Sequence, residues 1–211
     1  MSLFVVLLGG ELVVTTRLIR QIEGARVIAA DSGMKHAQAL GLSVEAWLGD
    51  FDSSDASLEQ LYNDVPRMTF PAEKDMTDGE LAVEEAIKRS ATALILVGAL
   101  GGARSDHAML NVTLMLALAE RGIRVFLTSG SEEVWPVSAY ESNFDLPLGT
   151  IVSIVALSDL QGLSIGGVKW PLANYDVPFG SSLTLSNEVC GDFKVTIKQG
   201  RAAIFVNITS G

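Results

Sequence analysis

Pairs of carboxylates at the ends of apolar segments are the clearest chemical feature of this sequence. The strongest case is GDFDS at residues 49–53, which directly follows the apolar run 44–48. Side chains alternate along an extended chain, so Asp50 and Asp52 point to the same side and can converge on one ion. An Asp-rich turn that ends a strand would look the same, and the motif alone favours neither interpretation.

A second acidic cluster, KDMTDGE at residues 74–80, precedes a segment with helical spacing of apolar residues. Thr77 and Glu80 have the spacing of a capping box, which predicts a helix that begins at Asp78. Capping accounts for these three residues, but it leaves Asp75 without a structural role. The start of this helix would bring carboxylates and a positive helix end to one place.

These acidic residues predict a metal site. Mg²⁺ prefers oxygen ligands, and a strongly acidic chain needs a cation if it is to bind phosphate. We expect one Mg²⁺–polyphosphate site formed by Asp50, Asp52, Asp75 and Asp78. With one cysteine and two histidines, the chain offers neither a thiolate zinc cage nor a His-rich metal site.

A glycine-rich loop follows the apolar run 93–97. It reads ALGGARSDH at residues 99–107. Gly101 and Gly102 give the backbone freedom to close around a ligand. Arg104 supplies a planar fork of donors that suits phosphate oxygens. The loop therefore predicts a phosphate contact.

The first residues after this loop also have structural interpretations. Ser105 is a credible N-cap for the helix that follows, Asp106 can compensate the helix dipole, and His107 can lie on the helix surface. An arginine beside an aspartate in a glycine-rich loop is nonetheless an unusual combination if nothing binds there.

A third candidate contact is Asp31, which with Ser32 and Gly33 follows the apolar run 26–30. In an open parallel sheet, ligands bind beyond the carboxyl ends of the strands, where helix N-termini present free N–H groups. Asp31 fits such a ligand contact. It fits equally well as the N-cap of a helix predicted over residues 34–40.

The composition limits the classes of function. The 211 residues contain 15 Lys and Arg against 25 Asp and Glu, a net charge of −10, which argues against binding to DNA, RNA or anionic membranes. The apolar run 3–8 is far shorter than the ~20 residues of a membrane-spanning helix, and we expect a buried strand there. A cytoplasmic protein without an internal disulfide is the default expectation.

Two kinds of pattern divide the chain. Apolar runs that alternate with helical segments predict an α/β N-terminal domain with a mainly parallel sheet over residues 1–135. Its expected strands are 4–8, 26–30, 44–48, 93–97 and 123–128, and its expected helices are 11–21, 34–40, 57–62, 78–87 and 105–121. Short alternating runs then predict a smaller, all-β, sandwich-like C-terminal domain over residues 136–211. These runs are 150–157, 182–185, 193–197 and 202–208.

Taken in order, the motifs resemble the thiamin pyrophosphokinase family. The matching pieces are residues 31–33, 49–53, 74–78 and 101–107, together with Asn111. The resemblance extends to VKWPL at residues 168–172 and LSNE at 185–188, and so covers most of the chain. Ser32 stands where the family pattern has a second glycine, and residues 131–150 match no part of that pattern.

The resemblance implies that Mg²⁺ assists the transfer of pyrophosphate from ATP to the hydroxyethyl group of thiamin, in a homodimer with sites at the subunit interface. The catalytic residues that it implies are Asp52, Asp75 and Arg104. The implied nucleotide-binding residues are Asp31, Ser32, Gly33, Gly101, Gly102, Arg104, Asp106 and His107. The implied thiamin-binding residues are Asp78, Trp170, Ser186 and Asn187. Trp170 in particular suits a cationic thiazolium ring.

Two other functions fit the same residues. A metal-dependent phosphohydrolase would use a similar Asp cluster with water as the nucleophile. A non-catalytic nucleotide-binding module would keep the glycine-rich loops but would not need so many carboxylates. At the thiamin residues, the alternatives are a core position for Trp170 and a turn at Ser186 and Asn187.

Overall fold

The computed structural model describes residues 2–51, 56–71, 75–139 and 142–208. The strands are β1 Leu3–Leu7, β2 Arg26–Ala30, β3 Ala46–Gly49, β4 Arg67–Thr69, β5 Ala93–Val97, β6 Arg124–Thr128, β7 Glu132–Pro136, β8 Ser142–Phe144, β9 Ile151–Ala156, β10 Leu160–Val168, β11 Leu172–Val177, β12 Asn187–Thr196 and β13 Ala202–Asn207. The helices are α1 Thr16–Ile22, the 3-10 helix η1 Asp31–Lys35, α2 His36–Leu40, α3 Ala56–Leu61, α4 Asp78–Lys88 and α5 Ser105–Glu120.

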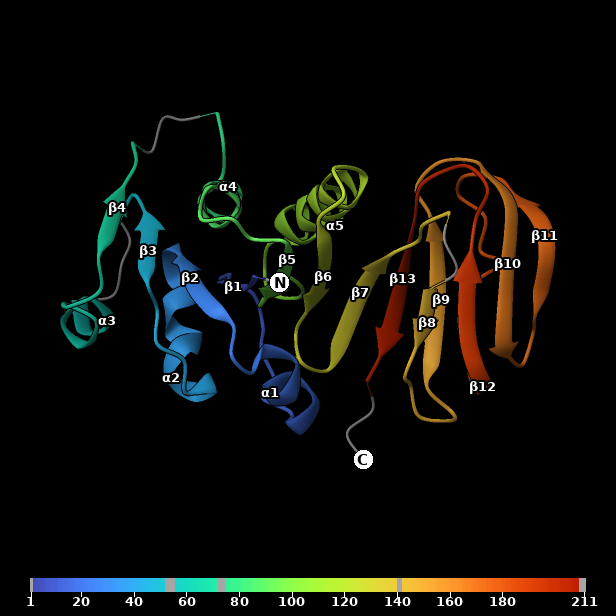
Figure 1. Ribbon diagram of the computed structural model, residues 1–211, viewed down its shortest axis with the longest axis horizontal. Coiled ribbons are helices and arrows are strands. Elements are labelled where there is room, and N and C mark those ends of the chain that lie inside the picture. The colour runs from blue at the N-terminus through green and yellow to red at the C-terminus, as the bar shows by residue number, and fades with distance from the viewer. Residues whose placement is uncertain (1, 52–55, 72–74, 140–141, 209–211) are drawn as a thin grey trace.

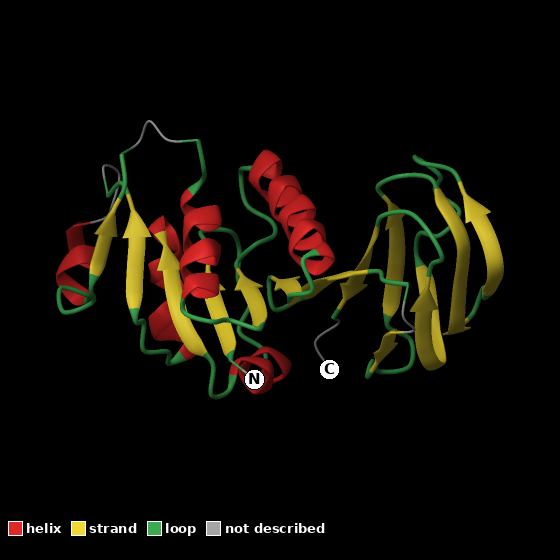
Figure 2. Cartoon of the chain, turned by 45° about the horizontal axis from the view of Figure 1, so that its top comes forward, coloured by secondary structure: helices red, strands yellow, loops and turns green. Residues whose placement is uncertain are grey.

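These strands join into one sheet that runs the length of the molecule (Figure 1). Their order is β4-β3-β2-β1-β5-β6-β7-β13-β9-β12-β10-β11, with β8 beside β12. The pairs from β4 to β6 are parallel, and the pairs from β6 onward are antiparallel. All described helices lie in the half formed by β1–β6, and the other half consists of strands and loops (Figure 2). The predicted fold class is therefore confirmed.

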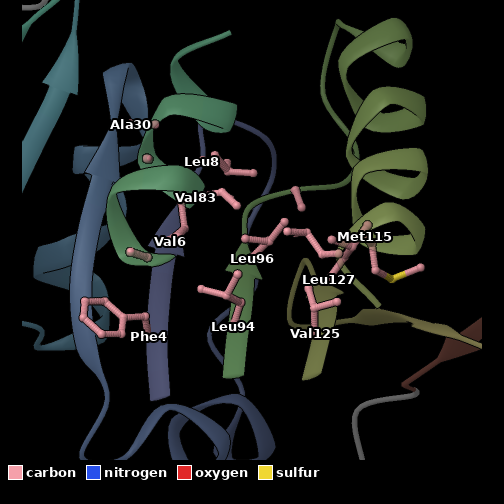
Figure 3. Packing of buried hydrophobic residues seen from close by; sticks show 14 of the residues in the cluster. Phe4, Val6, Leu8, Ala30, Val83, Leu94, Leu96, Met115, Val125 and Leu127 are labelled. Carbon is pink, nitrogen blue, oxygen red and sulfur yellow. The ribbon is translucent and has the colours of Figure 1, made fainter. Parts of the chain in front are cut away.

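The parallel strands other than the edge strand β4 are buried on both faces, which explains their unbroken apolar runs. On β1, Phe4 and Val6 belong to the core under α4 and α5, where Val83 and Met115 also lie (Figure 3). Val5 and Leu7 belong to the opposite core, which α1, α2 and α3 cover. Burial of both sets fixes the register of β1, because a slip by one residue would exchange them.

The chain reverses its direction across the sheet at β1. It passes outward through β2, β3 and β4, and then returns to pair β5 with the other side of β1. In open α/β sheets, such a reversal leaves a crevice beyond the carboxyl ends of the two central strands, and ligands bind in it. The topology thus places a candidate site where β1 and β5 end.

β7 links the two halves, because it pairs with β6 on one side and with β13 on the other. Beyond it, apolar side chains such as Ile154, Phe193 and Ile204 form a separate core between two β-layers. The predicted boundary after residue 135 lies inside β7, and the division into two domains stays a prediction. No helix in the described ranges is long and apolar enough to cross a membrane.

Of the two helix caps predicted at Thr77 and Ser105, the structure confirms the first and not the second. The capping box is confirmed: Glu80 N donates to Thr77 Oγ1 at 3.2 Å, Thr77 N donates to Glu80 Oε2 at 2.9 Å, and the helix begins at Asp78. Ser105 as an N-cap is wrong, because Arg104 is the cap residue and makes no side-chain capping bond.

Two predicted elements are wrong in position or type. The first helix begins at Thr16 instead of residue 11, because Glu11 N donates to Leu100 O in the loop after β5 and Val13 N donates to Ser129 O directly after β6. Residues 182–185 form a turn instead of a strand, closed by Leu185 N donating to Ser182 O at 3.2 Å.

Candidate active site

Two adjoining cavities lie at the carboxyl edge of the parallel sheet. The first, of about 410 Å³, lies among the ends of β2 and β3 and the starts of α4 and α5. The second, of about 350 Å³, lies beyond the ends of β1 and β5. Asp31, His107 and Asn111 line both, so the two cavities share a wall. The second occupies the crevice that the strand order predicts.

The first cavity has an acidic wall. Four predicted residues line it, namely Asp31, Asp50, Asp75 and Asp78. Asp52, predicted as both a metal ligand and a catalytic residue, lies outside the described residues. Within the described ranges, no group of three or more His, Cys, Asp or Glu side chains is arranged to hold a metal ion.

Asp31 lies at the meeting point of the cavities in a strained conformation. Its φ of 45° belongs to the left-handed region, which side chains with a Cβ rarely adopt. The buried Trp47 holds it there, because its indole Nε1 donates to Asp31 O at 2.9 Å. Sequence reasoning missed Trp47, since only the pairing of β2 with β3 brings the two residues together.

The glycine-rich loop after β5 lines the second cavity. Gly98, Gly101 and Gly102 all have positive φ, at 70°, 69° and 82°. A Cβ at Gly98 would collide with Leu8 O, so only glycine fits there. Asn111 of α5 fastens the loop, because its Nδ2 donates to Ala99 O at 2.8 Å.

Arg104 and Asp106 form an exposed two-point ion pair beside this loop. Arg104 Nε and Nη2 donate to the two carboxylate oxygens of Asp106 at 2.9 and 2.8 Å. These bonds hold the pKa of Asp106 well below its ordinary value and raise the pKa of Arg104. Among the predicted nucleotide residues, Arg104 and His107 line the second cavity with Ser32, Gly101 and Gly102.

The remaining predicted residues lie in the β-rich half. The side chain of Asn187 is buried and binds the backbone of Trp170: Nδ2 donates to Trp170 O at 2.8 Å, and Oδ1 accepts from Trp170 N at 3.1 Å. The Trp170 side chain is 57% exposed. Ser186 has a φ of 55°, and its N donates to Ser153 Oγ at 2.9 Å. Asn187 therefore positions the segment that presents Trp170.

Comparison with known proteins finds two family models along the chain. The model described as thiamin pyrophosphokinase, catalytic domain, matches residues 21–127, and the model described as thiamin pyrophosphokinase, vitamin B1 binding domain, matches residues 136–202. A curated thiamine pyrophosphokinase of Bacillus subtilis is 30% identical over 152 residues, which is 70% of each chain.

Solved structures with the same fold include proteins of this name. The crystal structure of thiamine pyrophosphokinase from Bacillus subtilis has a TM-score of 0.85 at 22% identity and covers 100% of both chains. The crystal structure of thiamin pyrophosphokinase from Geobacillus thermodenitrificans has a TM-score of 0.80 at 27% identity and covers 100% of this chain and 99% of that one. The enzyme from Candida albicans has a TM-score of 0.79 at 13% identity and covers 98% and 90%.

Proposed function

The chain belongs to the thiamin pyrophosphokinase family, and from this premise we propose that it transfers the pyrophosphate group of ATP to the hydroxyethyl group of thiamin. The products are thiamin diphosphate and AMP. The observation that carries the proposal is the match of both family models, in order, to the α/β half and the β-rich half. The cavities at the strand-order reversal support it from the geometry.

ATP binds in the second cavity under this proposal. Glycines of the loop after β5 allow close approach of its backbone, and α5 directs its positive N-terminal end to the same place. Arg104 contributes a fork that matches phosphate oxygens, and Asp31, Ser32, Gly33, Asp106 and His107 complete the nucleotide site.

The acidic wall suits Mg²⁺, because its donors are carboxylate oxygens. This ion usually binds through one or two carboxylates together with substrate phosphates, so a preformed cluster of three acids is not required. Asp50, Asp75 and Asp78 would hold it with Asp52, and the ion would supply neutralisation of the polyphosphate charge.

The proposed transfer is an in-line displacement at the β-phosphorus. The hydroxyl oxygen of thiamin bonds to this phosphorus while the bond to the oxygen that bridges to the α-phosphate breaks, and AMP leaves. The hydroxyl proton passes to an aspartate of the metal site, for which Asp52, Asp75 and Asp78 are the candidates. Arg104 stabilises charge on the phosphoryl oxygens, and positioning supplies most of the remaining rate enhancement.

Thiamin binds, in our proposal, between Asp78 of one subunit and Trp170, Ser186 and Asn187 of a second subunit in a homodimer. Aromatic side chains exposed in the β-rich half support this arrangement, since Trp170, Tyr175 and Phe179 expose 57%, 48% and 66% of their surface. An indole face is well suited to a cationic ring. The cytoplasmic location stays a prediction.

The decisive experiment incubates the purified protein with ATP, Mg²⁺ and thiamin and measures products by chromatography. We expect thiamin diphosphate and AMP in equal amounts, and neither product when thiamin is omitted or EDTA removes the metal. Release of phosphate without thiamin would favour the phosphohydrolase instead. ATP binding without any turnover would favour the non-catalytic nucleotide-binding module.

A further inference from the structure

The turn after β1 is held by two side chains that the proposed function does not use. Lys35 Nζ donates to Gly9 O at 2.7 Å, and His36 Nε2 lies 3.0 Å from Gly10 O. A carbonyl oxygen only accepts hydrogen bonds, so His36 must carry its proton on Nε2. Two adjacent residues thus bind two adjacent carbonyls, 26 positions apart in the sequence.

This turn forms the wall of the second cavity between β1 and β5. Gly9 and Gly10 both line the cavity, and Gly10 N donates to Gly98 O at 2.9 Å. A Cβ at Gly33 would collide with Leu7 O, so the segment that carries Lys35 packs directly on the end of β1. The turn is therefore fastened on one side to the glycine-rich loop and on the other to Lys35 and His36.

The positive charge of Lys35 gives this contact an electrostatic effect in addition to its structural one. Lys35 does not line the second cavity itself, but its ammonium group is bound to the carbonyl of Gly9, which does line it. A positive charge therefore lies beside the cavity wall, where it attracts a polyphosphate. Among the described residues, Lys35 forms no ion pair, whereas the fork of Arg104 is occupied by Asp106. The Lys35 side chain is exposed and has further donors beyond its bond to Gly9.

The buried imidazole of His36 acts differently. Burial holds its pKa below the ordinary value of 6.5, so the ring is neutral at pH 7. Its ring also lies in contact range of Gly98, since a Cβ at Gly98 would come within 3.2 Å of Nε2. His36 thus binds the turn after β1 and lies close to the turn after β5.

We propose that Lys35 is a phosphate-binding residue of the nucleotide site and that His36 is the positioning residue that holds the Gly9–Gly10 turn against the loop after β5. This inference rests on the proposed function, because it assigns the second cavity to ATP. It adds two residues that no motif in the sequence indicates.

Calorimetric titrations with ATP and Mg²⁺, without thiamin, test the inference in the full-length protein, with adenosine as a ligand that lacks phosphate. Lys35→Met should weaken ATP binding about 10-fold to 100-fold, the size expected for a charge-assisted hydrogen bond, and leave adenosine binding unchanged. Lys88→Met, in the exposed last turn of α4, is the matched control and should bind ATP as the wild type does.

His36→Leu removes the donor but keeps much of the volume, and it should weaken ATP binding about threefold to tenfold. His36→Gln places an amide N–H near the position of Nε2 and should restore affinity to within about twofold. A lower melting temperature in His36→Leu with unchanged ATP affinity would mean a structural role only and would overturn this assignment.

The outcomes separate this inference from the proposed function. Wild-type affinity in Lys35→Met, or an equal loss for ATP and adenosine, would overturn the phosphate-binding role of Lys35. If the wild type binds ATP but never forms thiamin diphosphate, the proposed function fails while the titrations still decide the roles of Lys35 and His36. If the wild type binds no ATP in these titrations, the inference about Lys35 and His36 is overturned, whereas the product assay with thiamin still decides the proposed function.

Discussion

The ion pair between Arg104 and Asp106 leaves the guanidinium of Arg104 available for exchange with a phosphate group. Its guanidinium is bound at two points by Asp106, but both side chains are mostly exposed. Exposed ion pairs contribute little net stability, because water and salt screen them. Exchange of Asp106 for a phosphate group would therefore cost little, and the fork already has the geometry that phosphate requires.

Replacing Arg104 with lysine tests this role. Arg104→Lys keeps the charge but loses the planar fork, so we expect the KM for ATP to rise about tenfold while the KM for thiamin changes little. Steady-state kinetics with each substrate varied in turn measure the difference. Arg121→Lys, which alters an arginine paired with Glu84 beyond the last turn of α5, is the control. Equal losses for the two substrates would contradict the assignment.

Asp75 offers the cleanest test of the acidic wall, because the capping box of α4 does not include it. Asp75→Asn should leave the melting temperature near that of the wild type and lower kcat about a hundredfold or more, since a carboxylate near the transferred group is lost. Asp64→Asn, at an exposed turn, should keep full activity. Near-wild-type turnover in Asp75→Asn would remove this residue from the site.

At the scale of elements, the sequence predicted best where local and tertiary forces agree. The bounds of β2 and β5 match the predicted runs 26–30 and 93–97, because a fully buried parallel strand is apolar throughout. The start of α4 was predicted because its capping box lies within four residues of sequence. The described acidic residues at strand ends were correctly predicted to lie at one edge of the sheet, because the carboxyl ends of parallel strands share that edge.

Elements that depend on distant contacts were not predicted. β10 contains three glycines, which weaken a strand pattern, yet Gly167 is required there because a Cβ would collide with Asp192 O on β12. The register between β10 and β12 shifts at this place. Trp47, Lys35 and His36, which bind residues that line the cavities, were missed for the same reason: their partners are far away in sequence.

β7 carries a titratable group whose burial has a measurable consequence. Glu132 is half-buried, and burial raises its pKa above the ordinary value of 4.5. The folded protein then binds the proton more tightly than the unfolded chain, so the free energy of unfolding falls as pH rises from 4.5 through the raised pKa.

Replacing Glu132 with glutamine removes this penalty. Glu132→Gln should have a higher melting temperature than the wild type at pH 7. The advantage should shrink as pH falls through the raised pKa and should be lost below about 4.5. Thermal unfolding across this pH range gives the comparison. Glu23→Gln, at the exposed end of α1, should follow the wild type at every pH. An advantage that does not depend on pH would contradict the role of burial.

At the scale of the whole molecule, the two halves are joined too firmly for a hinge at β7. The sheet continues through β7, and Arg17 of α1 binds Glu133 of β7 at 2.6 Å. The carboxylate of Glu133 is buried and also accepts from Gln21 and Trp135. A buried carboxylate that loses its ion-pair partner raises the free energy of the protein, so this contact resists separation of the halves.

This rigidity bears on the proposed thiamin site. α4, which begins at the acidic wall, and β10 and β11, which flank Trp170, lie toward opposite ends of the long axis of the molecule (Figure 1). Trp170 lines neither cavity of its own chain. If Trp170 covers thiamin near Asp78, the two residues must therefore come from different subunits, and a symmetric dimer would contain two such sites.

Mixing subunits tests this geometry directly. Asp75→Asn and Trp170→Ala homodimers should each be nearly inactive, but a dimer of one subunit of each kind contains one site with both native residues. After dissociation and random reassociation of equal amounts, about a quarter of wild-type activity should return, because half the dimers are mixed and each has one intact site of two.

Sedimentation should show that the wild type and all variants are dimers. Mixing Asp75→Asn with Arg104→Lys, which alter the same half of the site, leaves a defect in both sites of every mixed dimer. This mixture should show no activity beyond that of its Arg104→Lys sites and serves as the negative control. A site within one chain predicts that Asp75→Asn and Trp170→Ala regain no activity on mixing, because every chain then carries one defect in its own site.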